Sequence, residues 1–462
     1  MRRTPVLRSG AAIAVAAALA LGGCASLERK ASPGPSTPPA PTTDGSAPDA
    51  SLPAGLGIVG GGAARGGGTI QDGSLGDLPG GGSGLGPPSW VRPGMRLTFY
   101  GAAASVPQSE YTYIEDEGGD WEDPVTGKRY RRTDQSGEGM PSGAGEAYTQ
   151  TDVLAVDGTD VILSNTMYSI DLLARQYVLQ PMGGGRSPGA IVDGAWVNPD
   201  LLAAAVQGGA QGMTVLRGPY ALGGSQFDAV GFVATNDRGY QSSTFDAGSG
   251  VLLAMNASTQ GAASPIHGPN DAPQGNVQLA LSRFVGTRQL ETPGIDAPAP
   301  PWVATVQGLE YEGTYTASNP MDPASGPWVF PMAASIAFGD RGASWATFTS
   351  TTTVSGDGPA QTTEGAGATG STGLYWYDPA TLAAMSTGQV LDQDPVTGAA
   401  TTVGSIEAGG AGTVVHIVTA LDGVSLDLAY DVMTGVLVAL DLAQAVTGAT
   451  ISLRLAPGSF PG

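Results

Sequence analysis

The chain has 462 residues, of which 20 are Lys or Arg and 41 are Asp or Glu, so its formal net charge is −21. Such an acidic chain is a poor ligand for nucleic acid, because that binding depends on cationic side chains that neutralise phosphates. Cys24 is the single cysteine, which excludes an intrachain disulfide and a cysteine-based zinc site. We therefore expect no nucleic-acid partner, no metal and no other cofactor.

Residues 1–23 have the pattern of a secretory signal peptide. Three arginines among the first eight residues precede an apolar run over 11–21, which has the length of a signal-peptide core and is too short to span a bilayer. The sequence LGGC at 21–24 follows and resembles the lipobox of bacterial lipoproteins. The resemblance implies that Cys24 carries a diacylglyceryl group and a further acyl chain such as palmitate. We therefore expect a protein held on the cell membrane by lipid and exposed outside the cytoplasm.

Residues 24–88 are predicted to be a disordered linker that follows the lipidated cysteine. The segment at 33–39 favours polyproline II, and 55–86 is rich in glycine, which predicts flexible coil. The stretch 55–60 matches the GxGxxG fingerprint of dinucleotide-binding folds. No strand precedes it and the glycines that follow cannot form the required helix, so we do not expect a nucleotide site.

The globular region, 89–462, contains an internal repeat. Four segments of its first half recur in the same order in its second half, which predicts two homologous lobes at 89–290 and 302–462, joined by a proline-rich linker at 291–301. The largest insertion is expected in the first lobe, near 115–145. The matching segments are 87–97 with 300–311, 196–204 with 376–384, 245–254 with 430–439, and 278–281 with 450–453.

Each lobe is predicted to be mainly antiparallel β-sheet with one short helix. Val, Ile, Thr and aromatic residues alternate in segments such as 227–234 and 412–419. Asn198 and Asp378 each precede a proline and then leucines and alanines, which is typical of a helix start. An Asp-x-x-Ser/Thr-Gly element predicts hairpin turns, since Asp accepts backbone donors and Gly adopts positive φ. This element occurs at 123–127, 246–250, 394–398 and 431–435.

The lipobox and the pattern of a meandering sheet with a short helix loosely resemble the lipid-carrier lipoproteins of the LolA and LprG type. In that family a curved antiparallel sheet folds around helices and encloses an apolar cavity. The resemblance implies that each lobe could hold an acyl chain or another amphiphile.

Candidates for catalysis are few. His267 is expected in a loop and His416 on a strand face, and neither lies in a GxSxG or HExxH context. Carboxylates are abundant, but paired carboxylates occur in any acidic protein and do not by themselves predict glycoside hydrolysis. We expect no catalytic residues.

The densest group of acids, over 115–123, precedes four cations over 128–132. Several carboxylates together could hold calcium. The spacing lacks the pattern of an EF-hand, however, and the cations could pair with the acids across a hairpin, so we favour the hairpin. The residues concerned are Glu115, Asp116, Glu117, Asp120, Glu122 and Asp123, followed by Lys128, Arg129, Arg131 and Arg132.

Four tryptophans occur as two repeat-equivalent pairs: Trp90 with Trp302, and Trp196 with Trp376. Exposed tryptophans could stack on sugars, but equivalence between the copies favours a role in each core.

Together these features favour a lipid-anchored lipoprotein of the cell envelope that acts as a non-catalytic binding or interaction module for an amphiphile or an envelope protein. A structural or adhesive envelope protein is the second hypothesis, and a carboxylate-based hydrolase is the third.

Overall fold

The computed structural model describes residues 78, 84–107, 111–115, 121–122, 129–134, 142–170, 176–236, 239–260, 276–295, 297–318, 326–355, 360–370, 374–409 and 412–460. The protein is mainly β, and most of its strands belong to two large antiparallel sheets, one in each lobe.

Lobe 1 contains a nine-stranded sheet with the order β10-β11-β12-β13-β14-β1-β5-β6-β7. The helix α2 (Pro199–Gly208) and the short pair β8 (Ile191–Val192) and β9 (Trp196–Val197) connect the strand β7 to β10. The strands of the sheet are β1 (Met95–Pro107), β5 (Ser142–Asp157), β6 (Asp160–Ile170), β7 (Tyr177–Pro188), β10 (Thr214–Leu222), β11 (Ser225–Asn236), β12 (Gly239–Asp246), β13 (Leu252–Gln260) and β14 (Asn276–Gln289).

Lobe 2 contains a ten-stranded sheet with the order β18-β17-β16-β15-β24-β23-β22-β21-β20-β19. The 3-10 helix η2 (Pro301–Ala304) precedes it, and α3 (Pro379–Ala384) connects β18 to β19. The strands are β15 (Gly308–Ala317), β16 (Trp328–Arg341), β17 (Trp345–Val354), β18 (Gln361–Ala368), β19 (Val390–Gln393), β20 (Ala400–Gly409), β21 (Gly412–Leu421), β22 (Val424–Asp431), β23 (Leu437–Gln444) and β24 (Ala449–Leu455).

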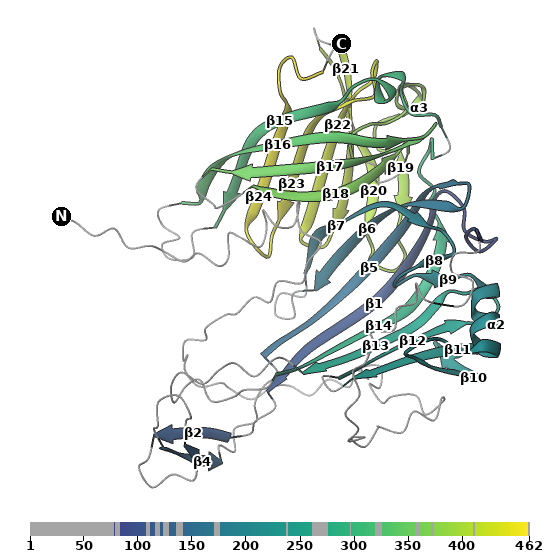
Figure 1. Cartoon of the computed structure of the whole chain (residues 1–462). Coiled ribbons are helices and arrows are strands. Elements are labelled where there is room, and N and C mark those ends of the chain that lie inside the picture. Colours follow the sequence, from purple (N-terminus) through teal and green to yellow (C-terminus); the bar gives the residue numbers. More distant parts are fainter. Residues whose placement is uncertain are drawn as a thin grey trace.

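The two lobes share one topology. In each, the first strand pairs with both the second and the last, and a helix follows the fourth strand. In Figure 1, β15–β18 cross in front of the β20–β24 layer, so the sheet of lobe 2 folds back over itself. The prediction of two homologous antiparallel lobes is therefore confirmed.

The repeated Asp turn shows how closely the copies agree. Asp246 accepts hydrogen bonds from the backbone N and Oγ of Ser249, at 2.8 and 2.6 Å. Asp431 accepts the same pair from Thr434, at 2.9 and 2.5 Å. The glycine after each hydroxyl residue has a φ between 72° and 79°, a conformation that other residues adopt only with strain. The turn prediction is confirmed at both positions.

A tryptophan fastens each of these turns to the start of its lobe. The indole of Trp90 donates to Ser249 O, and that of Trp302 donates to Thr434 O, both at 2.7 Å. Each ring also packs edge to face on a second tryptophan that is fully buried: Trp90 on Trp196, and Trp302 on Trp376. The tryptophans are core residues, as their repeat equivalence predicted.

Both helices begin where the sequence predicts. The side chain of Asn198 accepts a hydrogen bond from Asp200 N, and that of Asp378 accepts one from Thr381 N. The helix α2 then buries Leu201 and Leu202 against the inner face of the lobe 1 sheet.

The copies differ by insertions. A separate three-stranded sheet, with the order β2-β4-β3, lies between β1 and β5 in the chain order of lobe 1. Its strands are β2 (Tyr111–Glu115), β3 (Trp121–Glu122) and β4 (Arg129–Asp134). Lobe 2 has its own addition, β19, for which lobe 1 has no counterpart between α2 and β10.

The fourth predicted match, 278–281 with 450–453, is wrong in register. Strand pairing places Leu281 on the outer face of lobe 1, whereas Leu453 lies on the inner face of lobe 2 and is 5% exposed. The last strands differ because β14 contains a bulge at Val285, which shifts its side chains relative to β1.

Some residues that the composition places in the linker belong to lobe 1. Leu78 is 3% exposed, and Leu85 packs against the same core. The side chain of Asn198 also donates to Gly86 O at 2.9 Å. The packed body therefore includes residues before 89.

Candidate functional site

A row of buried polar side chains crosses the outer face of the lobe 1 sheet. Arg96 on β1 stands opposite Asp152 on β5 and opposite Arg288 on β14. Its guanidinium donates to both carboxylate oxygens of Asp152, at 2.6 and 2.7 Å. The neighbouring Leu97 points into the core, so the alternation of the strand places Arg96 on the outer face. Burial opposes the charge of Arg96, but the charge and hydrogen bonds of Asp152 raise its pKa above the ordinary value.

Lobe 2 supplies two further aspartates from its β19–β20 hairpin. Asp392 accepts two hydrogen bonds from Arg288, both at 2.6 Å. Asp394, in the turn after β19, lies 3.6 Å from Nη1 of Arg96 and accepts a hydrogen bond from Nε2 of Gln150. We call this group the clasp. Its members are Arg96, Gln150, Asp152 and Arg288 of lobe 1, with Asp392 and Asp394 of lobe 2.

Asp394 is held as a carboxylate although it is 1% exposed. Burial alone would raise its pKa. The hydrogen bonds from Val396 N, at 2.8 Å, and from Gln150, together with the charges of Arg96 and Arg288, hold the pKa below the ordinary value. Removing one partner from a buried ion pair typically costs about 3–5 kcal/mol, because the other charge is left uncompensated. The clasp therefore fixes how the lobes sit on each other.

Apolar contacts surround the clasp. Leu154 and Ile162 of lobe 1 form one cluster with Trp345 and its neighbours in lobe 2. Tyr168 and Leu179, also from lobe 1, belong to the core cluster of lobe 2. In Figure 1, β5, β6 and β7 lie directly below lobe 2. The outer face of lobe 1 thus closes part of the inner face of lobe 2. The short helix α3 therefore does not have to cover that face alone.

Three tyrosines lie side by side on the same outer face of lobe 1. Tyr100, Tyr148 and Tyr168 stand in register across β1, β5 and β6, and Tyr100 and Tyr148 have ring centroids 5.5 Å apart. Desolvation and the neighbouring Glu146 raise the pKa of Tyr100 to about 12. Burial likewise raises the pKa of Tyr168, so Tyr100 and Tyr168 act as neutral packing groups at physiological pH.

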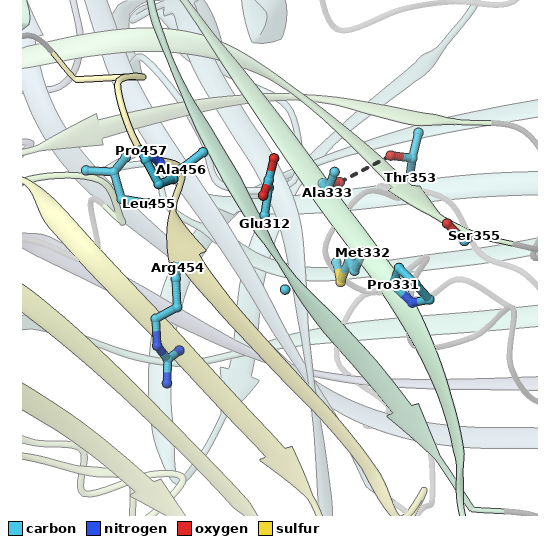
Figure 2. A pocket seen from close by; sticks show the side chains of 11 residues that line it. Glu312, Pro331, Met332, Ala333, Thr353, Ser355, Arg454, Leu455, Ala456 and Pro457 are labelled. Carbon is cyan, nitrogen blue, oxygen red and sulfur yellow. Dashed lines mark hydrogen bonds between the residues drawn. The ribbon is translucent and has the colours of Figure 1, made fainter.

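Lobe 2 carries a groove of about 570 Å³ on the surface that corresponds to the clasp surface of lobe 1. Strand pairing makes the correspondence explicit: Thr98 stands opposite Gln150 in lobe 1, as Glu312 stands opposite Ala333 in lobe 2. Figure 2 shows the groove. Its lining residues are Glu312, Gly313, Pro331, Met332, Ala333, Thr353, Ser355, Arg454, Leu455, Ala456 and Pro457.

The two charged residues of the groove do not neutralise each other. Glu312 and Arg454 stand opposite on β15 and β24, but Figure 2 shows their charged ends pointing in opposite directions. Arg454 instead donates to both oxygens of Asp441, at 3.0 and 2.9 Å. The groove therefore presents an exposed carboxylate beside small and apolar side chains.

His416 lies on the outer face of lobe 2, as predicted. Its Nδ1 is 3.1 Å from both carboxylate oxygens of Asp427, and its Nε2 is 3.8 Å from Glu407. His267 lies outside the described residues.

The acidic segment 115–123 is described only in part. In strand register Glu122 pairs with Arg129, one acid with one cation as the hairpin interpretation requires, whereas Glu115 pairs with Tyr130. Asp116, Glu117, Asp120 and Asp123 are outside the described part. Where the structure describes the chain, no three or more His, Cys, Asp or Glu side chains gather closely enough to hold a metal ion.

Cys24 and the predicted signal peptide, 1–23, also lie outside the described ranges. Within those ranges, no helix is both long enough and apolar enough to cross a membrane. No known family model matches the chain, and a search of curated proteins found no relative.

The sequence did not lead us to predict the clasp as a site. One signal was present, since Arg96 and Arg288 are cations within strands whose neighbouring residues are largely apolar or uncharged. Of their partners in lobe 2, Asp394 begins the predicted turn at 394–398 and Asp392 lies two residues before it. Nothing in the sequence pairs that turn with the first lobe.

Proposed function

We propose that this chain is a lipid-anchored lipoprotein of the cell envelope, exposed outside the cytoplasm, and that its two-lobed body is a non-catalytic interaction module. The lipobox at Cys24 supports the anchor. The single observation that carries the interaction role is the unequal use of equivalent surfaces: the outer face of lobe 1 around Arg96 and Gln150 is buried against lobe 2, whereas the corresponding region of lobe 2, around Glu312 and Ala333, bears an open groove.

Filling of the inner faces favours partner docking over carriage of an amphiphile. A carrier needs an apolar face that its ligand can occupy. In lobe 1 that face is covered by Trp196 and by Leu201 and Leu202 of α2, each at most 1% exposed. In lobe 2 it is covered by Trp376 and by Tyr168 of lobe 1.

The anchor is tested by detergent phase partition of whole cells that produce the protein. Wild-type protein should enter the detergent phase, and Cys24→Ser should move to the aqueous phase, because the thiol is the attachment point for the lipid. A Cys24→Ser protein that still partitions with detergent would show that the lipoprotein assignment is wrong.

The absence of a carrier role is tested by titrating the full chain, in a detergent that forms small micelles, with a fluorescent fatty acid. We expect no saturable binding beyond that of the micelles alone. Saturable binding at one or two sites per chain would favour a carrier instead.

A further inference from the structure

Beyond the clasp, three tyrosines form a continuous strip on the outer face of lobe 1. The ring centroid of Tyr148 on β5 lies 5.5 Å from that of Tyr100 on β1 and 6.5 Å from that of Tyr177 on β7. All three residues are partly exposed, whereas their neighbour Tyr168 is packed into the core of lobe 2 and is 7% exposed. We call Tyr100, Tyr148 and Tyr177 the tyrosine strip.

The tyrosine strip lies in a corner between the lobes. The backbone N of Tyr177 donates a hydrogen bond of 3.1 Å to Asp422 O, in the turn between β21 and β22 of lobe 2. In Figure 1, β5 and β7 lie directly below lobe 2. The sheet of lobe 1 is therefore the floor of this corner, and lobe 2 is its wall. Binding sites for small molecules occur preferentially at such boundaries between domains.

One cation and one anion flank the tyrosine strip. Arg283 on β14 stands opposite Tyr100. Glu146 on β5 stands opposite Ala102, two residues further along β1 and so on the same face, and Tyr100 forms a hydrogen bond with it. Both charged residues are partly exposed. Their opposite charges leave the patch polar but locally neutral, in a chain whose net charge is −21.

The tyrosines of the strip keep their hydroxyl groups available for hydrogen bonding. Burial and the neighbouring Glu146 raise the pKa of Tyr100 to about 12, and burial raises the pKa of Tyr177. Both phenols are therefore neutral at physiological pH, and each can donate and accept hydrogen bonds. Each ring also offers an apolar face.

This combination of groups suits a neutral glycan. The C–H face of a sugar packs on an aromatic ring, and sugar hydroxyls donate to a carboxylate such as that of Glu146 and accept from a guanidinium such as that of Arg283. A row of three rings can contact consecutive sugars of one chain. An acyl chain would instead desolvate both charged groups without pairing them, and the acidic protein repels an anionic polymer.

We propose that the tyrosine strip binds a neutral polysaccharide of the cell envelope. Tyr100, Tyr148 and Tyr177 stack on the sugars, and Glu146 and Arg283 bind their hydroxyls. The proposal rests on the interaction role proposed above and names the chemical class of the partner. It requires neither the lipid anchor nor the groove of lobe 2.

Native affinity electrophoresis of the full chain in detergent micelles tests the proposal. Separate gels contain dextran, hydroxyethylcellulose, mannan or arabinogalactan, which are neutral polymers of different sugars and linkages. At least one of them should slow the wild-type protein, and the anionic polysaccharide alginate should not. From the dependence of mobility on polymer concentration, Tyr148→Ala and Tyr100→Ala should each weaken binding about tenfold or more. Tyr148→Phe keeps the ring and should retain most of the affinity.

Two further variants separate lost contacts from lost folding. Arg283→Ala removes a flanking donor without removing a ring and should also weaken binding. Met433→Ala truncates a side chain of lobe 2 that is 80% exposed and should bind as wild type does. The thermal unfolding midpoint of every variant shows whether it is folded.

Three results would overturn the proposal: none of the four neutral polymers slows the wild-type protein, alginate slows it as strongly as they do, or folded Tyr100→Ala and Arg283→Ala migrate as wild type does. Failure of the interaction role itself would look different. Protein that binds neither glycan nor fatty acid overturns the glycan ligand alone, whereas saturable binding of the fatty acid overturns the interaction role.

Discussion

Arg96 and Arg288 stand directly opposite each other on neighbouring strands of lobe 1. Like charges at such positions repel and destabilise a sheet. The repulsion is offset because Arg96 lies against Asp152 and Asp394, and Arg288 against Asp392. Two of these three carboxylates come from lobe 2. The two arginines of lobe 1 are therefore fully compensated only when lobe 2 is docked.

Removing the carboxylate of Asp392 should therefore destabilise the whole body. Asp392→Ala leaves the guanidinium of Arg288 largely buried without its partner, and we expect the free energy of unfolding to fall by about 3 kcal/mol. Urea unfolding followed by tryptophan fluorescence measures this change. Asp228→Ala breaks an exposed ion pair with Arg217 and should leave the unfolding midpoint nearly unchanged. An equally small effect of both variants would show that the clasp does not stabilise the lobes.

The clasp also predicts how stability depends on pH. The folded pKa of Asp394 lies below the ordinary value of an aspartate, which is about 3.9. Its contribution is therefore fully present above that value and is lost as the pH falls through the lower, folded pKa. Unfolding curves from about pH 7 to about pH 3 should show Asp394→Asn less stable than wild type at neutral pH, with the difference shrinking in acid. A constant difference across this range would contradict the assignment.

Glycine is required where the Asp turn meets the strand that precedes each helix. Gly435 has a φ of 72°, and a Cβ there would collide with the carbonyl oxygen of Tyr377. Gly388 has a similar φ of 82°, but no other atom lies within 4 Å of its Cβ position. We expect Gly388→Ala to cost about 1 kcal/mol from backbone strain alone, and Gly435→Ala to cost at least about 2 kcal/mol. Thermal or urea unfolding would compare them, and equal losses would show that the close approach is unimportant.

The duplicated tryptophan contact should have the same energy in both lobes. Trp90→Phe and Trp302→Phe each keep an aromatic ring and remove one hydrogen bond of 2.7 Å to the turn. Each should lower the free energy of unfolding by about 1 kcal/mol, and the double variant by about the sum, since the two turns lie in different lobes. Strongly unequal losses of unfolding free energy in the two single variants would indicate that the two hydrogen bonds contribute differently to stability.

Much of the fold could be predicted because its signals are local. The caps at Asn198 and Asp378 and the turns beginning at Asp246 and Asp431 each involve contacts within three residues. A pattern of that length can be recognised in the sequence, and its structure depends little on the rest of the chain. The repeat then linked these local predictions into two lobes, and the structure has that arrangement. The fourth match failed where β14 contains a bulge, because a bulge changes which face a side chain takes without any clear compositional mark.

The sequence by itself determined the two-lobe β architecture, the helix starts and the turns, and it carries the lipobox-like sequence at 21–24 on which the proposed anchor depends. Only the tertiary structure decided which faces are buried and which remain open. Gln150 and Asp394 are 244 residues apart, and their contact depends on two sheets docking, which no local pattern encodes. The same docking makes equivalent surfaces unequal: that of lobe 1 is covered by a hairpin, and that of lobe 2 keeps its groove. Burial and charge compensation are properties of the assembled lobes, so the site emerges only when both are in place.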